Sequence, residues 1–135
     1  MVGTLGVNVG KSSIMGHSMG GLGALNLGIR NPGLYRSISA FAPICNPSTS
    51  DWGKSQFTRF LGENTADWNA YDPSELVKDG WLDNRKVLVH TGTADFALEK
   101  LNTEALKSAC EGKENVEINM VEGYGHDYYF ITTYA

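Results

Sequence analysis

The stretch SSIMGHSMGGLGALNLGIR, residues 12–30, indicates the fold class of this chain. Its centre, Gly16-His17-Ser18-Met19-Gly20, matches the pattern G-x-S-x-G. We expect the segment before it, residues 12–15, to be a buried strand. The run of small and apolar residues at 19–30 is typical of a helix, and it ends at the breaker Asn31-Pro32-Gly33. A strand that turns sharply into a helix at a serine is the setting of a nucleophile elbow.

The glycines of this pentapeptide have a physical role in such an elbow. The sharp turn holds the serine backbone in a strained conformation, and we expect side chains at the positions of Gly16 and Gly20, two residues either side of Ser18, to collide. The helix that follows would direct its first N–H groups, beginning with that of Met19, toward a developing oxyanion. Because the pattern is short, an ordinary glycine-rich turn is the alternative.

Outward from this stretch, strands alternate with helical segments. The expected elements are strands at 36–42, 86–90 and 116–120, a loop at 43–56, helices at 56–61, 73–77 and 98–111, and a turn at 123–126. Strands separated by helical segments favour parallel pairing through right-handed crossovers. The sequence therefore predicts an α/β fold with a mostly parallel sheet.

Composition excludes several functional classes. The chain has 135 residues, 41% of them hydrophobic and 19% charged, which supplies apolar material for the core of one domain. A formal net charge of −4 and the lack of a basic stripe argue against nucleic-acid binding. No apolar run approaches the roughly 20 residues of a membrane-spanning helix. The two cysteines, Cys45 and Cys110, belong to no Cys/His cluster, so we expect reduced thiols and no metal site.

A serine needs a base, and the base an orienting acid, to act as a nucleophile. Of the three histidines, His17 lies within the elbow and cannot easily reach its neighbour's hydroxyl, and His90 ends an expected strand, where a structural role is common. His126 follows the last expected strand in a glycine-flanked turn, and Asp95 lies in the loop after the preceding strand. The chain order Ser18, Asp95, His126 is that of the α/β-hydrolases.

These candidates all follow strands, at the edge where α/β sheets place their sites. Asp127 is the competing acid, but side chains of consecutive residues seldom face each other, so we expect it to cap a helix instead. Two roles stay open for the aromatic residues after the last strand, which either line a pocket or cover the sheet. They are Tyr124, Tyr128, Tyr129 and Phe130.

Several longer segments carry a family resemblance. They are GHSMGGLGAL at 16–25, SAFAPICNP at 39–47, WGK at 52–54, AYDPSELVK at 70–78 and EGYGHDYYFI at 122–131. In this order, and over nearly the whole chain, they are similar to S-formylglutathione hydrolase, also called esterase D. The segments APICNP and YYFI are far more specific than G-x-S-x-G.

The resemblance implies the α/β-hydrolase fold and a cytosolic hydrolase, without cofactor or metal, that converts S-formylglutathione to glutathione and formate and also cleaves carboxylic esters. It implies Ser18 as nucleophile, Asp95 as acid and His126 as base, with the backbone N–H of Met19 as an oxyanion donor. The partner that it implies is a small glutathione thioester, not a nucleic acid or a membrane, and a homodimer is a further expectation. Lys54 is a candidate for binding a carboxylate of glutathione.

The chain also departs from the family pattern. Ala94 stands where the family often has a second acidic residue, and Gly125 stands where an aspartate commonly precedes the histidine. Family members are about twice as long, so the resemblance implies that residues 1–135 are the C-terminal half of an α/β-hydrolase domain. An N-terminal part would then supply the second oxyanion donor and cover the strand before Ser18.

Without that part, we expect an unpaired strand edge and an apolar sheet face to be exposed. Two alternatives to an active hydrolase follow from this expectation. One is an inactive fragment of the enzyme, and the other is a module that binds a partner through its open sheet edge.

Overall fold

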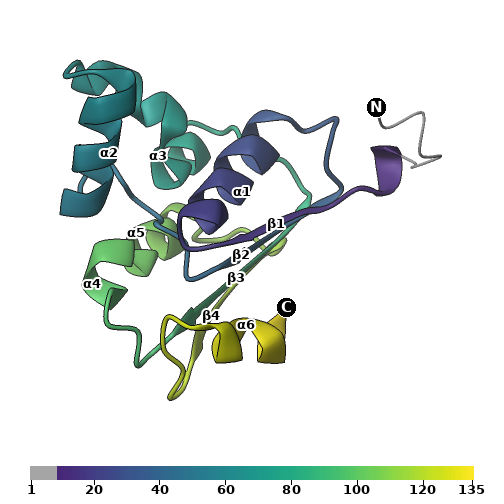
Figure 1. Ribbon diagram of the computed structural model, residues 1–135. Helices are drawn as coiled ribbons and strands as arrows, with labels where there is room; N and C mark the ends of the chain where they lie inside the picture. Colours follow the sequence, from purple (N-terminus) through teal and green to yellow (C-terminus); the bar gives the residue numbers. More distant parts are fainter. Residues whose placement is uncertain (1–8) are drawn as a thin grey trace.

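The computed structural model describes residues 9–135 and contains one four-stranded sheet (Figure 1). The strands are β1 (Ile14–His17), β2 (Ser37–Phe41), β3 (Lys86–Gly92) and β4 (Val116–Val121). They lie side by side in chain order, and each neighbouring pair is parallel. The register aligns His17 with Phe41 and Phe41 with His90. The predicted α/β fold with a parallel sheet is confirmed.

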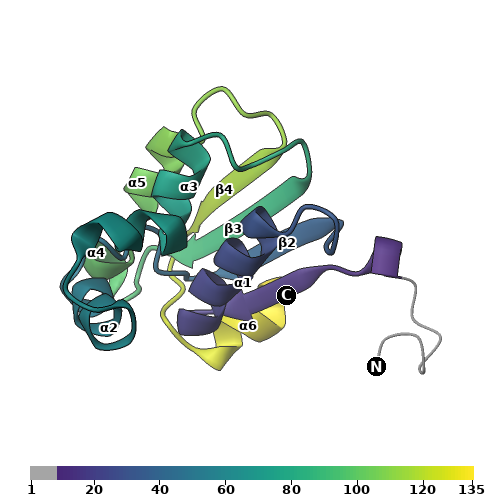
Figure 2. The ribbon, with the colours of Figure 1, turned by 90° about the horizontal axis from the view of Figure 1, so that it is seen from above.

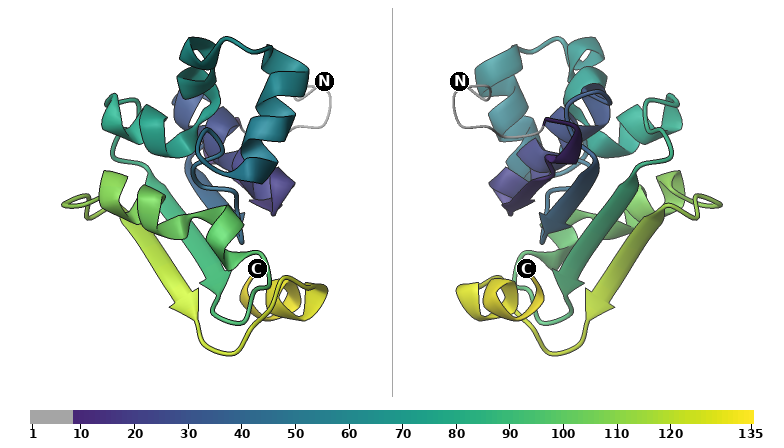
Figure 3. Two further views of the ribbon diagram at one scale, coloured as in Figure 1. Left: turned by 90° about the vertical axis from the view of Figure 1, so that its left-hand side faces the viewer. Right: turned by 90° about the vertical axis from the view of Figure 1, so that its right-hand side faces the viewer.

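The helices divide unequally between the two faces of the sheet. Helices α1, α3 and α5 cover one face, whereas α6 lies on the other (Figures 1 and 2). Figure 3 shows α6 apart from the other helices, at the end to which the strands run. The helical segments are η2 (Val9–Lys11), α1 (Met19–Arg30), α2 (Asp51–Leu61), η3 (Thr65–Tyr71), α3 (Pro73–Lys78), α4 (Leu98–Leu101), α5 (Thr103–Ala109) and α6 (Tyr128–Tyr134). Among residues 9–135, no helix has the length and apolar character needed to cross a membrane.

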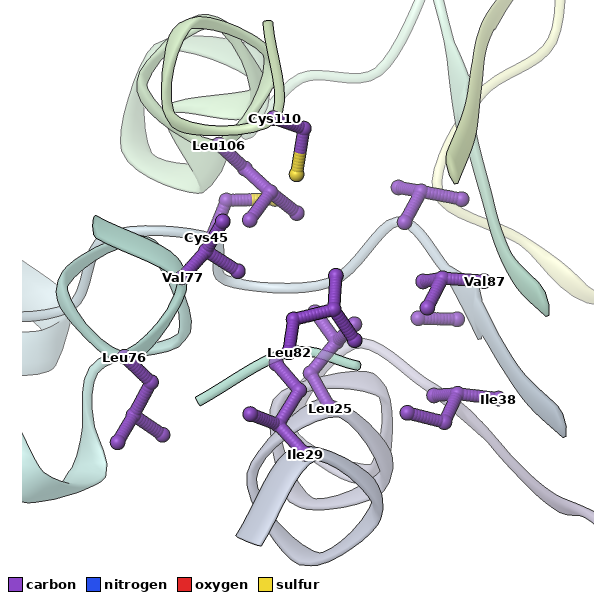
Figure 4. Packing of buried hydrophobic residues seen from close by; sticks show 12 residues of the cluster. Leu25, Ile29, Ile38, Cys45, Leu76, Val77, Leu82, Val87, Leu106 and Cys110 are labelled. Atoms are coloured by element: carbon purple, nitrogen blue, oxygen red, sulfur yellow. The ribbon is translucent and has the colours of Figure 1, made fainter. Parts of the chain in front are cut away.

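The main core lies between the sheet and the layer of α1, α3 and α5 (Figure 4). Leu25 and Ile29 of α1 are fully buried and face Ile38 of β2 and Val87 of β3. Burying a side chain of this size contributes about 1.5–3 kcal/mol. A Cβ on Gly28 would lie 2.5 Å from Ile38 Cγ1, so this glycine allows α1 to approach the sheet closely. The position of α1 fixes the direction of the turn before it.

Two expected elements differ from the structure. The segment 43–56 was expected to be a loop, but α2 begins at Asp51, because the Ser50 side chain accepts a hydrogen bond from Gly53 N (3.1 Å) and caps the helix. The single helix expected at 98–111 is two helices, α4 and α5. Asn102 separates them in the left-handed conformation (φ 49°, ψ 50°), which a continuous helix cannot contain.

The second face of the sheet corrects one further expectation. Met15 of β1 is 58% exposed, so the strand before the elbow is not fully buried. Outside the area near α6, this face carries apolar side chains, such as Met15 and Leu88, together with polar ones. Its residues include Ser37 and Ser39 of β2, Lys86 of β3 and Glu117 of β4. In the described part of the chain β1 pairs only with β2, so the expected open edge is present.

Candidate active site

Ser18 lies between the end of β1 and the start of α1, in a strained backbone conformation (φ 56°, ψ −119°). Two hydrogen bonds hold the turn: Ser18 N donates to Phe41 O (2.9 Å), and Leu22 N donates to Ser18 O (3.0 Å). A Cβ on Gly16 would overlap the backbone of Gly20, as expected for a nucleophile elbow. The expectation for Gly20 itself is wrong, because in the described chain no atom outside its immediate neighbours and the nearby backbone of α1 lies within 4 Å of a Cβ built there.

Met19, the predicted oxyanion donor, is the first residue of α1. Its N–H therefore belongs to the four at a helix start that have no carbonyl partner within the helix. The partial positive charge of the helix N-terminus adds to the effect of such a donor. The structure thus places a free backbone donor directly after Ser18, while the role of this donor stays a prediction.

Asp95 and His126, the predicted acid and base, form a close pair. His126 Nδ1 lies 2.7 Å from Asp95 Oδ2, and the two side chains are 11% and 0% exposed. The other carboxylate oxygen, Oδ1, accepts a hydrogen bond from Ala97 N (2.8 Å). The carboxylate is fixed from both sides, so it can hold the imidazole in one orientation and stabilise its cationic form.

The loops that carry this pair are joined by their backbones. Thr93 N donates to Val121 O (2.9 Å), and Ala94 N donates to Tyr124 O (3.0 Å). Gly92, at the end of β3, lies so close to Tyr124 that a Cβ there would overlap its carbonyl. The loop after β3 and the loop after β4 therefore form one unit, with Asp95 on the first and His126 on the second.

Ser18 lies beside the unit formed by these two loops, because His17, the residue before it, contacts His126. The rings of His17 and His126 have centroids 4.6 Å apart, with planes inclined by 41°. Within residues 9–135, Ser18 Oγ forms no hydrogen bond with His126. The structure thus joins Asp95 to His126 directly and places Ser18 next to the pair, in the order that the sequence predicts.

The other candidates also have definite positions. Asp127 caps α6, because its Oδ1 accepts a hydrogen bond from Phe130 N (2.9 Å), as expected. His90 is satisfied on one side only: its Nε2 lies 2.9 Å from Asn119 Nδ2, whereas Nδ1 is buried and has no partner in the described chain. Burial lowers the pKa of His90, and a weaker opposite effect comes from Glu117.

Both cysteines are free thiols, as expected, and both are buried in the main core. Burial raises the pKa of Cys45 to about 12 and also raises that of Cys110. Neither thiol therefore has the character of a nucleophile. Among residues 9–135, no group of three His, Cys, Asp or Glu side chains is placed to hold a metal ion.

The aromatic residues after β4 serve different purposes. Phe130 is fully buried under the sheet, with Tyr124 packed against it, so these two cover the second face. Tyr128 and Tyr129 are exposed beside the loop that carries His126. The role of covering the sheet is confirmed for Phe130 and Tyr124, whereas the pocket role stays a prediction for Tyr128 and Tyr129.

Sequence reasoning missed two groups near the site. Phe96 is 79% exposed, and its ring lies edge to face with that of His126, with the centroids 5.6 Å apart. The available signal in the sequence was a phenylalanine directly after Asp95. A small pocket beside the elbow is lined by Met19, Ile44, Trp52, Ser55 and Gln56. Lys54 is exposed on α2 and is not among these lining residues.

A parallel sheet, a strained serine turn between strand and helix, and a histidine–aspartate pair at the same sheet edge define the α/β-hydrolase class. The comparisons with known proteins agree. The family model described as "Putative esterase" matches residues 2–134. The chain belongs to this esterase family.

The relatives found include S-formylglutathione hydrolases. Those of Bos taurus and Mus musculus are 44% and 46% identical over 127 residues, which is 92% of this chain and 45% of each relative. A solved S-formylglutathione hydrolase from Agrobacterium tumefaciens superposes with a TM-score of 0.91 at 38% identity, and the match covers 98% of this chain and 49% of that one. This chain thus spans about half the length of the proteins it resembles.

A more distant structure shows the same fold. FphF, a serine hydrolase of Staphylococcus aureus, is 16% identical and superposes with a TM-score of 0.76 over 98% of this chain. Agreement at such low identity concerns the arrangement of strands and helices alone. The strands and helices described above therefore follow a fold that this more distant protein shares.

Proposed function

We propose that this chain supplies the nucleophile, base and acid of a serine hydrolase that cleaves S-formylglutathione to glutathione and formate. The observation that carries the proposal is the 2.7 Å contact of His126 Nδ1 with Asp95 Oδ2, next to the strained turn of Ser18. The substrate class comes from the S-formylglutathione hydrolases at 44–46% identity.

In the first half of the reaction, Ser18 Oγ attacks the formyl carbon of the thioester while its proton passes to His126 Nε2. Asp95, hydrogen-bonded to Nδ1, stabilises the imidazolium. The N–H of Met19 stabilises the negative oxygen of the tetrahedral intermediate. Collapse of the intermediate breaks the C–S bond, and the proton on His126 goes to the departing glutathione thiolate.

In the second half, water attacks the formyl ester on Ser18, and His126 takes the proton of that water. The second tetrahedral intermediate breaks its bond to Ser18 Oγ, which recovers the proton from His126, and formic acid leaves and releases its remaining proton to the solvent as it becomes formate. Every proton moves between substrate, water and one imidazole, so the chain needs no cofactor for these steps. Simple carboxylic esters pass through the same type of intermediate, and we include them as a side activity.

The proposal includes the location of the enzyme, its assembly state and its substrate partner. We infer a cytoplasmic location and a homodimer as the assembly state, with a small glutathione thioester as the partner. The pocket beside Met19 and Trp52 lies at the elbow and offers an apolar wall to the substrate. Sedimentation at several concentrations would distinguish a dimer from a monomer.

The central test is the labelling of the serine. A fluorophosphonate probe should label the wild-type chain and leave Ser18→Ala unlabelled, and formate release from S-formylglutathione should disappear in the same variant. Ser55→Ala is a matched control, because Ser55 lines the neighbouring pocket without belonging to the elbow. Equal labelling of wild type and Ser18→Ala would contradict the proposal, as would a folded wild-type chain that the probe does not label.

A further inference from the structure

His17 is the residue before the candidate nucleophile, and its ring lies on the same side of the sheet as His126. Side chains alternate between the two faces along a strand, which places Ile14 of β1 in the core under α1 and His17 on the opposite face. The loop of His126 and helix α6 occupy that face (Figures 1 and 3). The ring centroids of the two histidines are 4.6 Å apart.

The hydrogen bond to Asp95 does not by itself fix the imidazole of His126. A single bond at Nδ1 leaves the ring able to rock about that contact, and the direction of Nε2 would change with it. Two ring contacts limit this motion: His17 with planes inclined by 41°, and Phe96 with planes inclined by 69°. Because aromatic rings in contact favour particular relative orientations, both neighbours oppose a rotation of the imidazole.

The charge state of His17 suits this contact. Its Nε2 is buried and has no hydrogen-bond partner in the described chain. Burial lowers the pKa of His17, the nearby His126 lowers it further, and the carboxylates of Asp95 and Asp127 raise it by less. At neutral pH His17 is therefore uncharged, and it does not repel the imidazolium that forms on His126 during the reaction.

We propose that His17 is a positioning residue whose ring holds the imidazole of His126 in the orientation that directs Nε2 at Ser18. This inference rests on the proposed function. His17 does not touch the reacting atoms in this role; it acts through His126. If the ring only filled space between β1 and α6, His17→Ala would lower the free energy of unfolding without a specific change in kcat.

The sheet provides a matched control. His90 lies in the same register row as His17, two strands away, and also has a lowered pKa and a buried nitrogen without a partner in the described part of the chain. Its ring contacts Phe41 and Tyr134 and not His126. His90→Ala should therefore reduce stability to a similar degree as His17→Ala while kcat stays within about twofold of wild type.

The experiment compares kcat and KM for S-formylglutathione in His17→Ala, His17→Phe and His90→Ala. We expect His17→Ala to lower kcat by about 10- to 100-fold with little change in KM, because small misplacements of a catalytic group have effects of this size. His17→Phe keeps a stacking ring and should recover most of kcat. A folded His17→Ala with wild-type kcat, or a His17→Phe no better than His17→Ala, would overturn the proposal.

A readout independent of turnover separates this inference from the proposed function. The Nδ1–H proton of His126, held by Asp95, should give a resolved downfield NMR signal in the wild type and in His90→Ala. In His17→Ala we expect it to broaden or shift, and in His17→Phe to return. If the wild type shows the signal but no hydrolysis, the proposed function fails while the positioning role is still tested. An unchanged signal in His17→Ala would rule out that role.

Discussion

Gly92 at the end of β3 lies against the carbonyl of Tyr124, in the loop after β4, more closely than any side chain would allow. This contact sets the distance between the loop of Asp95 and the loop of His126. We expect Gly92→Ala to push the two loops apart, lowering the free energy of unfolding by about 1–3 kcal/mol and kcat by at least tenfold. Chemical denaturation and formate release would measure the two effects.

Gly23 offers the control for that substitution. It lies within α1, and in the described chain no atom outside its immediate neighbours and the nearby helix backbone is within 4 Å of a Cβ built there. Gly23→Ala should leave kcat unchanged and raise the free energy of unfolding by up to about 1 kcal/mol, because alanine favours a helix more than glycine does. Equal free energies of unfolding for Gly92→Ala and Gly23→Ala would show that the close contact at Gly92 does not limit the space for a side chain.

The Asp95 carboxylate should be indispensable for the reaction but not for the fold. Asp95→Asn keeps the shape of the side chain but favours the wrong tautomer of His126, so we expect kcat to fall by about 10³–10⁴. Asp127→Asn is the matched control, because asparagine caps a helix as well as aspartate does. If kcat of Asp95→Asn stayed within threefold of the wild-type value, Asp95 would not be the orienting acid. A large loss of kcat in Asp127→Asn would point to Asp127 instead.

The strained turn at Ser18 should oppose stability. Its φ of 56° is unfavourable for serine and accessible to glycine, so Ser18→Gly should raise the free energy of unfolding by about 1 kcal/mol while abolishing fluorophosphonate labelling. Ser18→Ala should abolish labelling without this gain, since alanine has the same backbone restriction. A Ser18→Gly variant less stable than Ser18→Ala would contradict the strain argument.

Stability should fall on the acid side of neutrality. The pKa of His90 is lowered in the folded chain, so between that lowered value and the ordinary value of about 6.5 the unfolded chain binds more protons. The free energy of unfolding therefore rises with pH through this window and declines as the pH drops below about 6.5. Urea unfolding from pH 5 to pH 8 would show the slope. His90→Phe, which cannot take up a proton, should reduce the slope and leave the part that comes from His17, whose pKa is also lowered, and an unchanged slope would assign the effect to other groups.

The buried thiols predict a simple chemical result. With its pKa raised to about 12, Cys45 is almost entirely protonated at pH 8 and also shielded from reagent. A chromogenic disulfide reagent should therefore titrate two thiols in guanidinium and, over the same minutes, almost none in the native chain. Rapid reaction of Cys45 in the native state would show that the core around it opens readily.

The sequence predicted the helices and site residues that are marked by a pattern of residues close together in the chain. The helix at 19–30 was predictable from its apolar run and its stop at Pro32, and Asp95 and His126 could be selected because each follows a strand. The break at Asn102 could not, since the apolar spacing continues across it and only the tertiary packing selects its left-handed conformation. In the contact of His17 with His126, the loop after β4 reaches the end of β1, which lies three strands away in the sheet, and no local pattern contains this arrangement.

The order of the strands has a consequence for dynamics. In the described chain, Ser18 follows β1, which is paired on one side only, whereas Asp95 follows β3, which is paired on both. A strand with one partner detaches at a lower free energy than a strand between two others. Amide hydrogens of β1 should therefore exchange with solvent faster than those of β3. Each opening of β1 would carry the serine away from Asp95 and His126, so the site can be interrupted and restored without unfolding the domain.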